Sequence, residues 1–282
     1  MRFKQTLQAV GLRRPASLCK RAVYRATGLA VSAVEAFRPF RTPAHHHLPH
    51  RLQMLRGRYE PAETLFFRRE ARDARLVVDI GANIGYFTRL LATAGGPETR
   101  VVALEPNPVP FRFLERNTRD LPNVVRLPVG LSDTAGTVDL FTANDDTAVG
   151  TLAADVLHAT LGPAIRLART AVKLVRGDTL FAELGLGEPD LVKIDVEGWE
   201  LDALRGLGGL PGRWRRTRIL FEFNPPVLRA LGHDPRELLG WWQQLGYRLC
   251  TLGPRGEPAT AAPDTLAELS VMNGYCSLVA RR

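Results

Sequence analysis

Residues 76–88 read LVVDIGANIGYFT, an apolar run followed by a glycine-containing turn and a second apolar segment. The run Leu76-Val77-Val78 predicts a buried parallel strand, and Tyr86-Phe87 predicts the start of a helix. A glycine turn between a strand and a helix lets a ligand approach the backbone closely, because no side chain stands in the way. The helix N-terminus adds exposed N–H groups. Such a turn either binds a nucleotide-like molecule or serves tight packing.

The next predicted strand ends in an acidic residue. Residues 100–108 read RVVALEPNP, in which an apolar run precedes Glu105. Glu105 lies 20 residues after Gly85. An acidic residue about 20 residues past such a turn can accept hydrogen bonds from ribose hydroxyls. Its position directly after an apolar strand favours this role over that of a solvated loop carboxylate.

Four motifs together resemble those of FkbM-type methyltransferases, which are class I enzymes dependent on S-adenosylmethionine. The motifs are DIGANIG at Asp79–Gly85, EPNP at Glu105–Pro108, LSD at Leu131–Asp133 and KIDVEGWE at Lys193–Glu200. The resemblance extends from about residue 59 to the C-terminus and rests on the joint order and spacing of the motifs. We therefore interpret residues 1–58 as a basic N-terminal extension and linker, and residues 59–282 as an FkbM-like methyltransferase domain.

The resemblance implies that the first two motifs bind the methionine and ribose parts of the cofactor. Gly81, Asn83 and Gly85 are expected to surround the methionine part. Asp79 is expected to accept hydrogen bonds near its amino group, directly or through water. Glu105 is expected to bind the ribose.

Three further residues complete the cofactor site that the resemblance implies. Asn107 is expected to assist at the same turn as Glu105. Ser132 and Asp133 match the family's Ser-Asp dipeptide and are expected near the adenine. Serine and aspartate also favour turns and helix caps, so a purely structural role for these two residues stays open.

Strand-like and helix-like segments alternate along the chain. Predicted strands cover residues 76–79, 101–104, 123–129, 137–142, 170–176, 191–194, 218–223, 247–252 and 275–280. Predicted helices cover residues 86–94, 109–119, 199–207 and 234–245. This alternation predicts an α/β fold with a mostly parallel twisted sheet and helices on both faces. The resemblance implies the Rossmann-like arrangement of class I methyltransferases, in which ligands lie outside the carboxyl ends of the strands. Residues 143–168 are the least predictable part.

Methyl transfer to an alcohol is helped by a general base, and three carboxylates near strand ends are candidates. They are Asp195, Glu197 and Glu222. Asp195 ends the strand nearest the expected acceptor site, whereas Glu197 could equally stabilise the N-terminus of helix 199–207. Asp195 and Glu197 could also raise one another's pKa. They could instead bind a divalent cation, although no other feature of the sequence supports a metal site. Lys193 could pair with one of these acids, and His233 is either a helix-start residue or a base.

The positive charge of the chain is concentrated at its N-terminus. The net charge is +9, with +11 in residues 1–58 and −2 in residues 59–282. The main domain therefore has no bulk charge that predicts nucleic-acid binding. Residues 1–40 are basic and mildly amphipathic, which suits a helix packed on the domain, a peripheral membrane contact or a transit peptide. Residues 39–50 are predicted to be a linker whose three consecutive histidines are not expected to form a metal site.

No run of 18 apolar residues predicts a membrane-spanning helix. The three unpaired cysteines favour a reducing compartment, so we expect a cytoplasmic protein, with membrane association through residues 1–40 as an alternative.

The sequence predicts an O-methyltransferase acting on a hydroxyl of a sugar, glycolipid or secondary metabolite. A small molecule or a glycan is then its partner. A non-catalytic scaffold and an NAD-dependent oxidoreductase are the alternatives, and the turn lacks the G-x-G-x-x-G spacing of the latter.

Overall fold

The computed structural model describes residues 18–282 except residues 37, 45, 144–145, 153, 155–156, 159–161 and 163–164. The first 17 residues of the basic extension, His45 and several positions of the unpredictable segment 143–168 lie outside the described residues.

The core is an eight-stranded sheet in the order β11-β10-β12-β9-β8-β1-β2-β3. Its strands are β1 (Leu76–Ile80), β2 (Arg100–Leu104), β3 (Val124–Leu127), β8 (Leu191–Ile194), β9 (Arg218–Phe223), β10 (Arg248–Leu252), β11 (Pro258–Thr260) and β12 (Cys276–Arg281). Strands β3, β2, β1, β8 and β9 are parallel to one another, whereas β12, β10 and β11 add antiparallel pairs at one end. The predicted mostly parallel α/β sheet is therefore confirmed.

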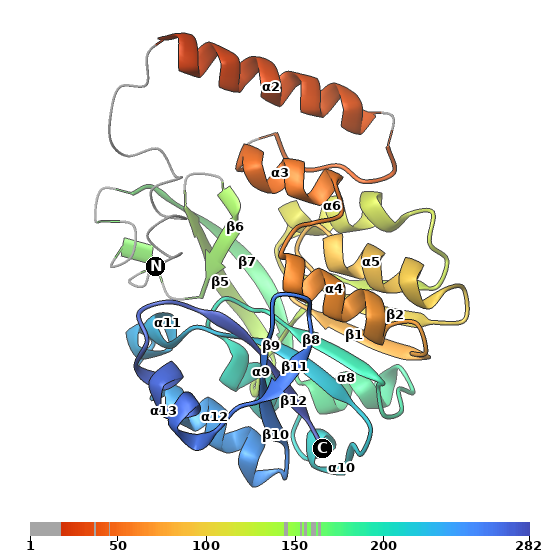
Figure 1. The fold of residues 1–282 in the computed structure, drawn as a ribbon, viewed down its shortest axis with the longest axis vertical. Coiled ribbons are helices and arrows are strands. Elements are labelled where there is room, and N and C mark those ends of the chain that lie inside the picture. Colours follow the sequence, from red (N-terminus) through yellow and green to blue (C-terminus); the bar gives the residue numbers. More distant parts are fainter. Residues whose placement is uncertain are drawn as a thin grey trace.

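Helices cover both faces of this sheet (Figure 1). The helices before β3 are α3 (Leu48–Leu55), α4 (Pro61–Glu70), α5 (Tyr86–Gly95) and α6 (Pro108–Thr118). The later helices are α8 (Gly177–Glu183), α9 (Glu200–Gly206), α10 (Leu210–Arg213), α11 (Pro225–Ala230), α12 (Pro235–Gln244) and α13 (Pro263–Val271). Successive residues of a strand point to opposite faces, so Val77 packs with α4 and α5 while Val78 packs with α9 and α12.

A second sheet, which the sequence did not separate from the first, has the order β4-β7-β5-β6. It consists of β4 (Gly130–Leu131), β5 (Gly136–Ala143), β6 (Asp146–Thr151) and β7 (Leu167–Val175). The predicted strands 137–142 and 170–176 are its β5 and β7, which pair in antiparallel fashion. The predicted strand 123–129 ends at Leu127, and β4 pairs with β7 instead of extending the large sheet.

The N-terminal segment contacts the domain through buried polar groups. Helix α2 (Leu18–Ala36) lies outside α3 (Figure 1). The two are joined by an ion pair in which Arg51 Nη2 lies 3.0 Å from Glu35 Oε2, with both side chains almost fully buried. In the predicted linker, the backbone of Arg41 donates to and accepts from the side chain of Asn117 on α6, each at 2.8 Å. No helix among the described residues is long and apolar enough to cross a membrane.

Candidate functional site

The site lies where the direction of the chain through the sheet reverses. From β1 the parallel strands continue outward through β2 to β3, whereas β8 and β9 lie on the other side of β1. In open α/β sheets the crevice for ligands forms at such a switch point, outside the carboxyl ends of the strands. Asp79 in β1, the turn after it, and the residues at the end of β8 all lie at this point.

The two glycines of the turn are required by close packing. Gly81 has φ +80°, and a Cβ added there would lie 1.9 Å from the carbonyl oxygen of Asp195. Gly85 has φ +83°, and its Cβ would lie 2.8 Å from Leu114 Cδ1. Gly81 thus lets the turn after β1 contact the end of β8, while Gly85 lets α5 contact α6. The sequence left two interpretations of the glycine turn, ligand binding and tight packing. Tight packing at Gly81 does not conflict with ligand binding at the same turn.

Glu105 connects the two cofactor motifs. Its Oε2 accepts a hydrogen bond from the backbone N–H of Asn83, and its Oε1 accepts one from Asn107, both at 2.8 Å. Burial raises the pKa of Glu105 to about 7, although these two hydrogen bonds oppose the rise. Asp79 is fully buried and accepts from Thr88 Oγ1 at 2.6 Å. Asp79 Oδ1 and Asn83 Oδ1 have no hydrogen-bond partner among the described residues, so both remain available as acceptors.

The other three predicted cofactor residues differ in their surroundings. The side chain of Asn107 accepts from the backbone N–H of Val109 at 3.1 Å and caps α6. Ser132 is buried at the end of β4, and its carbonyl oxygen would lie 2.1 Å from a Cβ placed on Gly206 of α9. The carbonyl of Asp133 accepts from Arg176 Nη1 at 2.6 Å. These contacts agree with the structural interpretation of the Ser-Asp dipeptide, and its role near adenine stays a prediction.

A buried ion pair joins the cofactor motifs to the candidate base. Lys193 Nζ lies 2.9 Å from Asp195 Oδ2, as the sequence suggested, with the Lys193 side chain 5% exposed and the Asp195 side chain 33% exposed. Burial opposes the charge on Lys193, but Asp195 and Asp79 raise its pKa above the ordinary lysine value. Lys193 also lies 5.3 Å from the ring of Phe87. The ammonium group of Lys193 therefore interacts both with Asp79 of the cofactor motif and with Asp195, the candidate base.

Carboxylates outnumber cations around Lys193. Burial raises the pKa of Glu197 well above its ordinary value, and the nearby Asp195 and Glu200 raise it further. Burial likewise raises the pKa of Glu222, with Asp195 and Glu197 adding to the effect. Glu222 Oε2 is buried without a hydrogen-bond partner among the described residues. The three predicted catalytic carboxylates thus lie within electrostatic reach of one another, and two of them favour the protonated form.

Sequence reasoning missed two acids of this cluster. Glu60 precedes α4, has φ +41° and carries a pKa of about 8, raised by burial and by Asp195. Glu200 is fully buried at the start of α9, and its Oε1 accepts from the backbone N–H groups of Val196 and Gly198, each at 3.2 Å. Glu200 therefore stabilises the turn between β8 and α9, and the helix-start interpretation of Glu197 stays a prediction. The available signals were the Glu60-Pro61 helix start and an acid at the first helical position of α9.

His233 lies between α11 and α12, where its backbone N–H donates to the carbonyl of Leu228 at 2.9 Å. Asp234 caps α12 by accepting from the N–H of Arg236 at 2.9 Å, as a helix-start signal predicts. Within the described ranges, no group of three or more His, Cys, Asp or Glu residues is arranged to hold a metal ion.

The raised pKa of Glu60 predicts a pH-dependent stability effect. A carboxyl whose folded pKa is about 8 contributes stability that is present below its ordinary value of 4.5 and is lost as the pH rises through 8. Glu60→Gln removes that titration. We expect the variant to match the parent at pH 5 and to exceed it at pH 9 by at least about 1 kcal/mol of unfolding free energy, since one pKa unit is worth about 1.4 kcal/mol.

Denaturant titrations at both pH values measure this effect. Glu268→Gln, which alters an exposed carboxylate on α13, is the matched control and should show no such dependence on pH. An equal gain for Glu60→Gln at pH 5 and at pH 9 would contradict the electrostatic explanation.

The chain is similar in sequence to known methyltransferases. Residues 79–249 match the model of the methyltransferase FkbM domain. The chain is 32% identical over 192 residues to the hexuronic acid methyltransferase AglP of Haloferax volcanii, covering 67% of this chain and 69% of that protein. It is 32% identical over 186 residues to the methyltransferase sdnD of Sordaria araneosa, covering 56% of this chain and 71% of that protein.

Solved structures show a weaker likeness. An O-methyltransferase from Bacillus cereus in complex with SAH aligns over 99% of this chain and 96% of its own, with 16% identity and a TM-score of 0.43. A TM-score below 0.5 adds nothing to what the sequence relatives establish.

Proposed function

This chain belongs to the FkbM methyltransferase family and is an S-adenosylmethionine-dependent methyltransferase, and we propose that its acceptor is a hydroxyl group of a sugar, a glycolipid or a secondary metabolite. The hexuronic acid specificity in the name of one relative supports a sugar or another small metabolite. The observation that carries the proposal is the Lys193–Asp195 ion pair, because an alcohol must lose a proton and Asp195 presents a partly exposed carboxylate to accept it.

The residues around the turn fit S-adenosylmethionine. Its α-ammonium group is a hydrogen-bond donor, and Asp79 Oδ1 and Asn83 Oδ1 are buried acceptors that no described residue occupies. Each oxygen of Glu105 accepts one backbone N–H. A carboxylate oxygen can accept a second hydrogen bond, so Glu105 can also accept a ribose hydroxyl. The absence of a side chain at Gly81 lets this turn pack directly against the backbone of Asp195, which brings the cofactor motif and the candidate base together.

Asp195 is the base in this proposal. Bound S-adenosylmethionine supplies a methyl group on a positively charged sulfur. Asp195 orients the acceptor hydroxyl and takes its proton as the methyl group passes from sulfur to oxygen, which is general-base catalysis. Lys193 holds the Asp195 carboxylate in position through the 2.9 Å contact. Because Lys193 is buried, the pair is little screened by water.

Glu197 and Glu222 have a different role in this proposal. Burial raises the pKa of both residues and so favours the protonated carboxyl, which can donate a hydrogen bond. We assign them to binding hydroxyl or ring oxygens of the acceptor rather than to proton abstraction.

The ribose role of Glu105 predicts a loss of cofactor affinity in Glu105→Gln. The amide keeps the size of the side chain, but its nitrogen cannot accept a hydrogen bond from the backbone N–H of Asn83 or Asn107. We expect affinity for S-adenosylhomocysteine to fall by about 1–3 kcal/mol, or roughly 5- to 150-fold. Calorimetric titration measures this change, and Glu115→Gln on the exposed side of α6 is the matched control. Unchanged affinity in a folded Glu105→Gln sample would refute the ribose role.

The proposed function is tested by titrating the purified chain with S-adenosylhomocysteine and with NAD, followed by transfer of labelled methyl groups to hydroxyl and amine acceptors. Binding of the first ligand only, with label on sugar hydroxyls, is the expected result. NAD binding would favour the oxidoreductase alternative. Binding of S-adenosylhomocysteine with label on nitrogen alone would overturn the hydroxyl acceptor while leaving the methyltransferase intact.

A further inference from the structure

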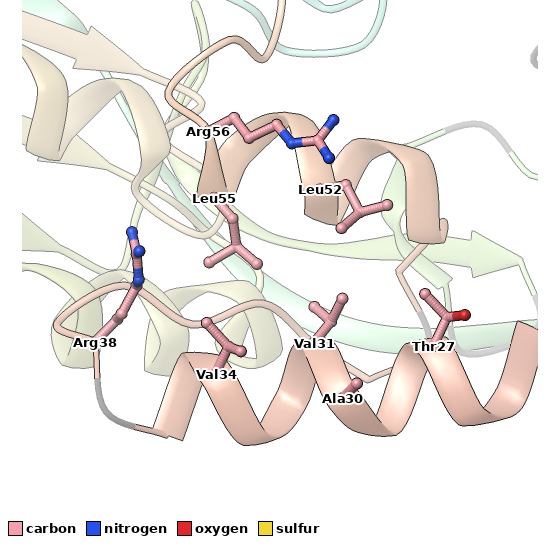
Figure 2. A pocket seen from close by; sticks show the side chains of 8 residues that line it. All are labelled: Thr27, Ala30, Val31, Val34, Arg38, Leu52, Leu55 and Arg56. Atoms are coloured by element: carbon pink, nitrogen blue, oxygen red, sulfur yellow. The ribbon is translucent and has the colours of Figure 1, made fainter.

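An apolar groove lies between α2 and α3, far along the chain from the catalytic motifs. It has a volume of about 280 Å³. Its lining residues are Thr27, Ala30, Val31, Val34, Arg38, Leu52, Leu55 and Arg56. Figure 2 shows Val31 and Val34 of α2 pointing toward Leu55 of α3 across this groove. The two arginines are exposed, so the groove combines an apolar floor with a cationic rim.

Two apolar side chains of α2 are exposed. Val34, which lines the groove, is 50% exposed, and Leu29, which is not among the lining residues, is 73% exposed. Isolated exposed apolar residues are ordinary on protein surfaces, but apolar residues beside a groove and within a basic segment are typical of helices that lie on a membrane surface.

The charge of this face has a single sign because of one buried pair. Glu35 is the only acidic residue of residues 1–58, which also contain 12 Lys and Arg residues. Glu35 is buried and paired with Arg51. Arg51 also donates to Thr42 Oγ1 at 2.7 Å and to Ser32 Oγ at 2.9 Å. The one negative charge of the segment is therefore neutralised in the interior, and the exposed charged residues of its described part are Arg38, Arg56 and Arg58.

Helix α6 extends the positive surface. Arg116 and Arg119 are exposed at its C-terminal end, on either side of Asn117, whose side chain exchanges two hydrogen bonds with the backbone of Arg41. Arg41 belongs to the segment between α2 and α3, which connects this cluster to the groove rim at Arg38 and Arg56.

We propose that the α2–α3 face, with its groove and arginine rim, docks the protein onto a bilayer that contains anionic phospholipids. Leu29 and Val34 enter the interface between headgroups and acyl chains, and the groove receives apolar lipid surface. Arg38 and Arg56 contact phosphate groups, since each basic residue near an anionic bilayer contributes to binding. A second copy of the chain would have to supply acidic groups to this face. The one acid of residues 1–58, Glu35, is buried in its ion pair with Arg51 and is not available for such a contact. This argues against self-association of two copies through the same surface.

Co-sedimentation with vesicles tests the proposal. The full chain should bind vesicles of phosphatidylcholine with about one-third phosphatidylglycerol. It should bind much more weakly to phosphatidylcholine alone, and its binding should fall at 0.5 M salt, where the screening length shortens. Arg38→Ala/Arg56→Ala should lower vesicle affinity by about 10- to 30-fold. The charge-matched control is Arg72→Ala/Arg255→Ala, which removes two exposed arginines elsewhere and should bind like the parent.

An apolar comparison tests the insertion step. Leu29→Asp should abolish vesicle binding, whereas Val271→Asp, at an equally exposed position on α13, should retain it. Unchanged circular dichroism and S-adenosylhomocysteine affinity show that each variant is folded. Equal binding to neutral and anionic vesicles, or retained binding in Leu29→Asp, would overturn the proposal. So would a dimer in light scattering that Leu29→Asp dissociates, because the face would then be an interface between copies.

Discussion

Asp195→Asn should reduce turnover by about 100- to 10,000-fold, the usual range for loss of a general base. The amide keeps the size of the side chain but cannot take the proton of the acceptor hydroxyl. Cofactor affinity should change much less, because the cofactor motifs lie at the ends of β1 and β2 whereas Asp195 ends β8. Steady-state kinetics with a hydroxyl acceptor, together with calorimetric titration of S-adenosylhomocysteine, separate the two quantities.

Glu197→Gln is the matched control for this prediction. Burial raises the pKa of Glu197 and favours its protonated form, which an amide resembles in size and in carrying no charge. We expect its turnover to fall by less than about tenfold. A severe loss in Glu197→Gln with a mild loss in Asp195→Asn would transfer the role of base to Glu197. A loss confined to cofactor affinity would move Asp195 into the cofactor site.

Gly81→Ala should destabilise the fold and lower cofactor affinity together. A Cβ there would lie 1.9 Å from the carbonyl oxygen and 2.9 Å from the carbonyl carbon of Asp195, both backbone atoms that cannot rotate away. The left-handed backbone conformation adds about 1–2 kcal/mol for any residue with a Cβ, and overpacking typically adds about 1–3 kcal/mol. We therefore expect a loss of about 2–5 kcal/mol in unfolding free energy, measured by denaturant titration.

Gly246→Ala isolates the contribution of the clash. Gly246 has φ +81°, almost the same as Gly81, but a Cβ there meets nothing within 4 Å. This control should lose only the conformational contribution and should bind S-adenosylhomocysteine like the parent. Equal stability losses in the two variants would show that the turn after β1 can move away from β8 without consequence.

Much of the core could be predicted because its signals are local. Helix α5 begins at Tyr86 and α12 follows the Asp234 cap, both close to their predicted positions, since caps and apolar periodicity act over a few residues. The separate sheet of β4 to β7 could not be predicted in the same way. A strand's own sequence specifies its alternation, but the choice of a partner strand depends on where distant segments pack.

The sequence by itself determined the strand–turn–helix unit around Gly81, the acidic residue at the end of β2 and the family to which the chain is similar. These depend on neighbouring residues and on motif order. Only the tertiary structure decided which acids meet. Glu60 before α4, Asp195 after β8 and Glu222 in β9 are far apart in the chain, yet the nearby Asp195 adds to the burial that raises the pKa of both Glu60 and Glu222. Their meeting follows from strand order and helix packing, and burial, which raises the pKa of Glu60 and Glu222, arises only when the chain is folded.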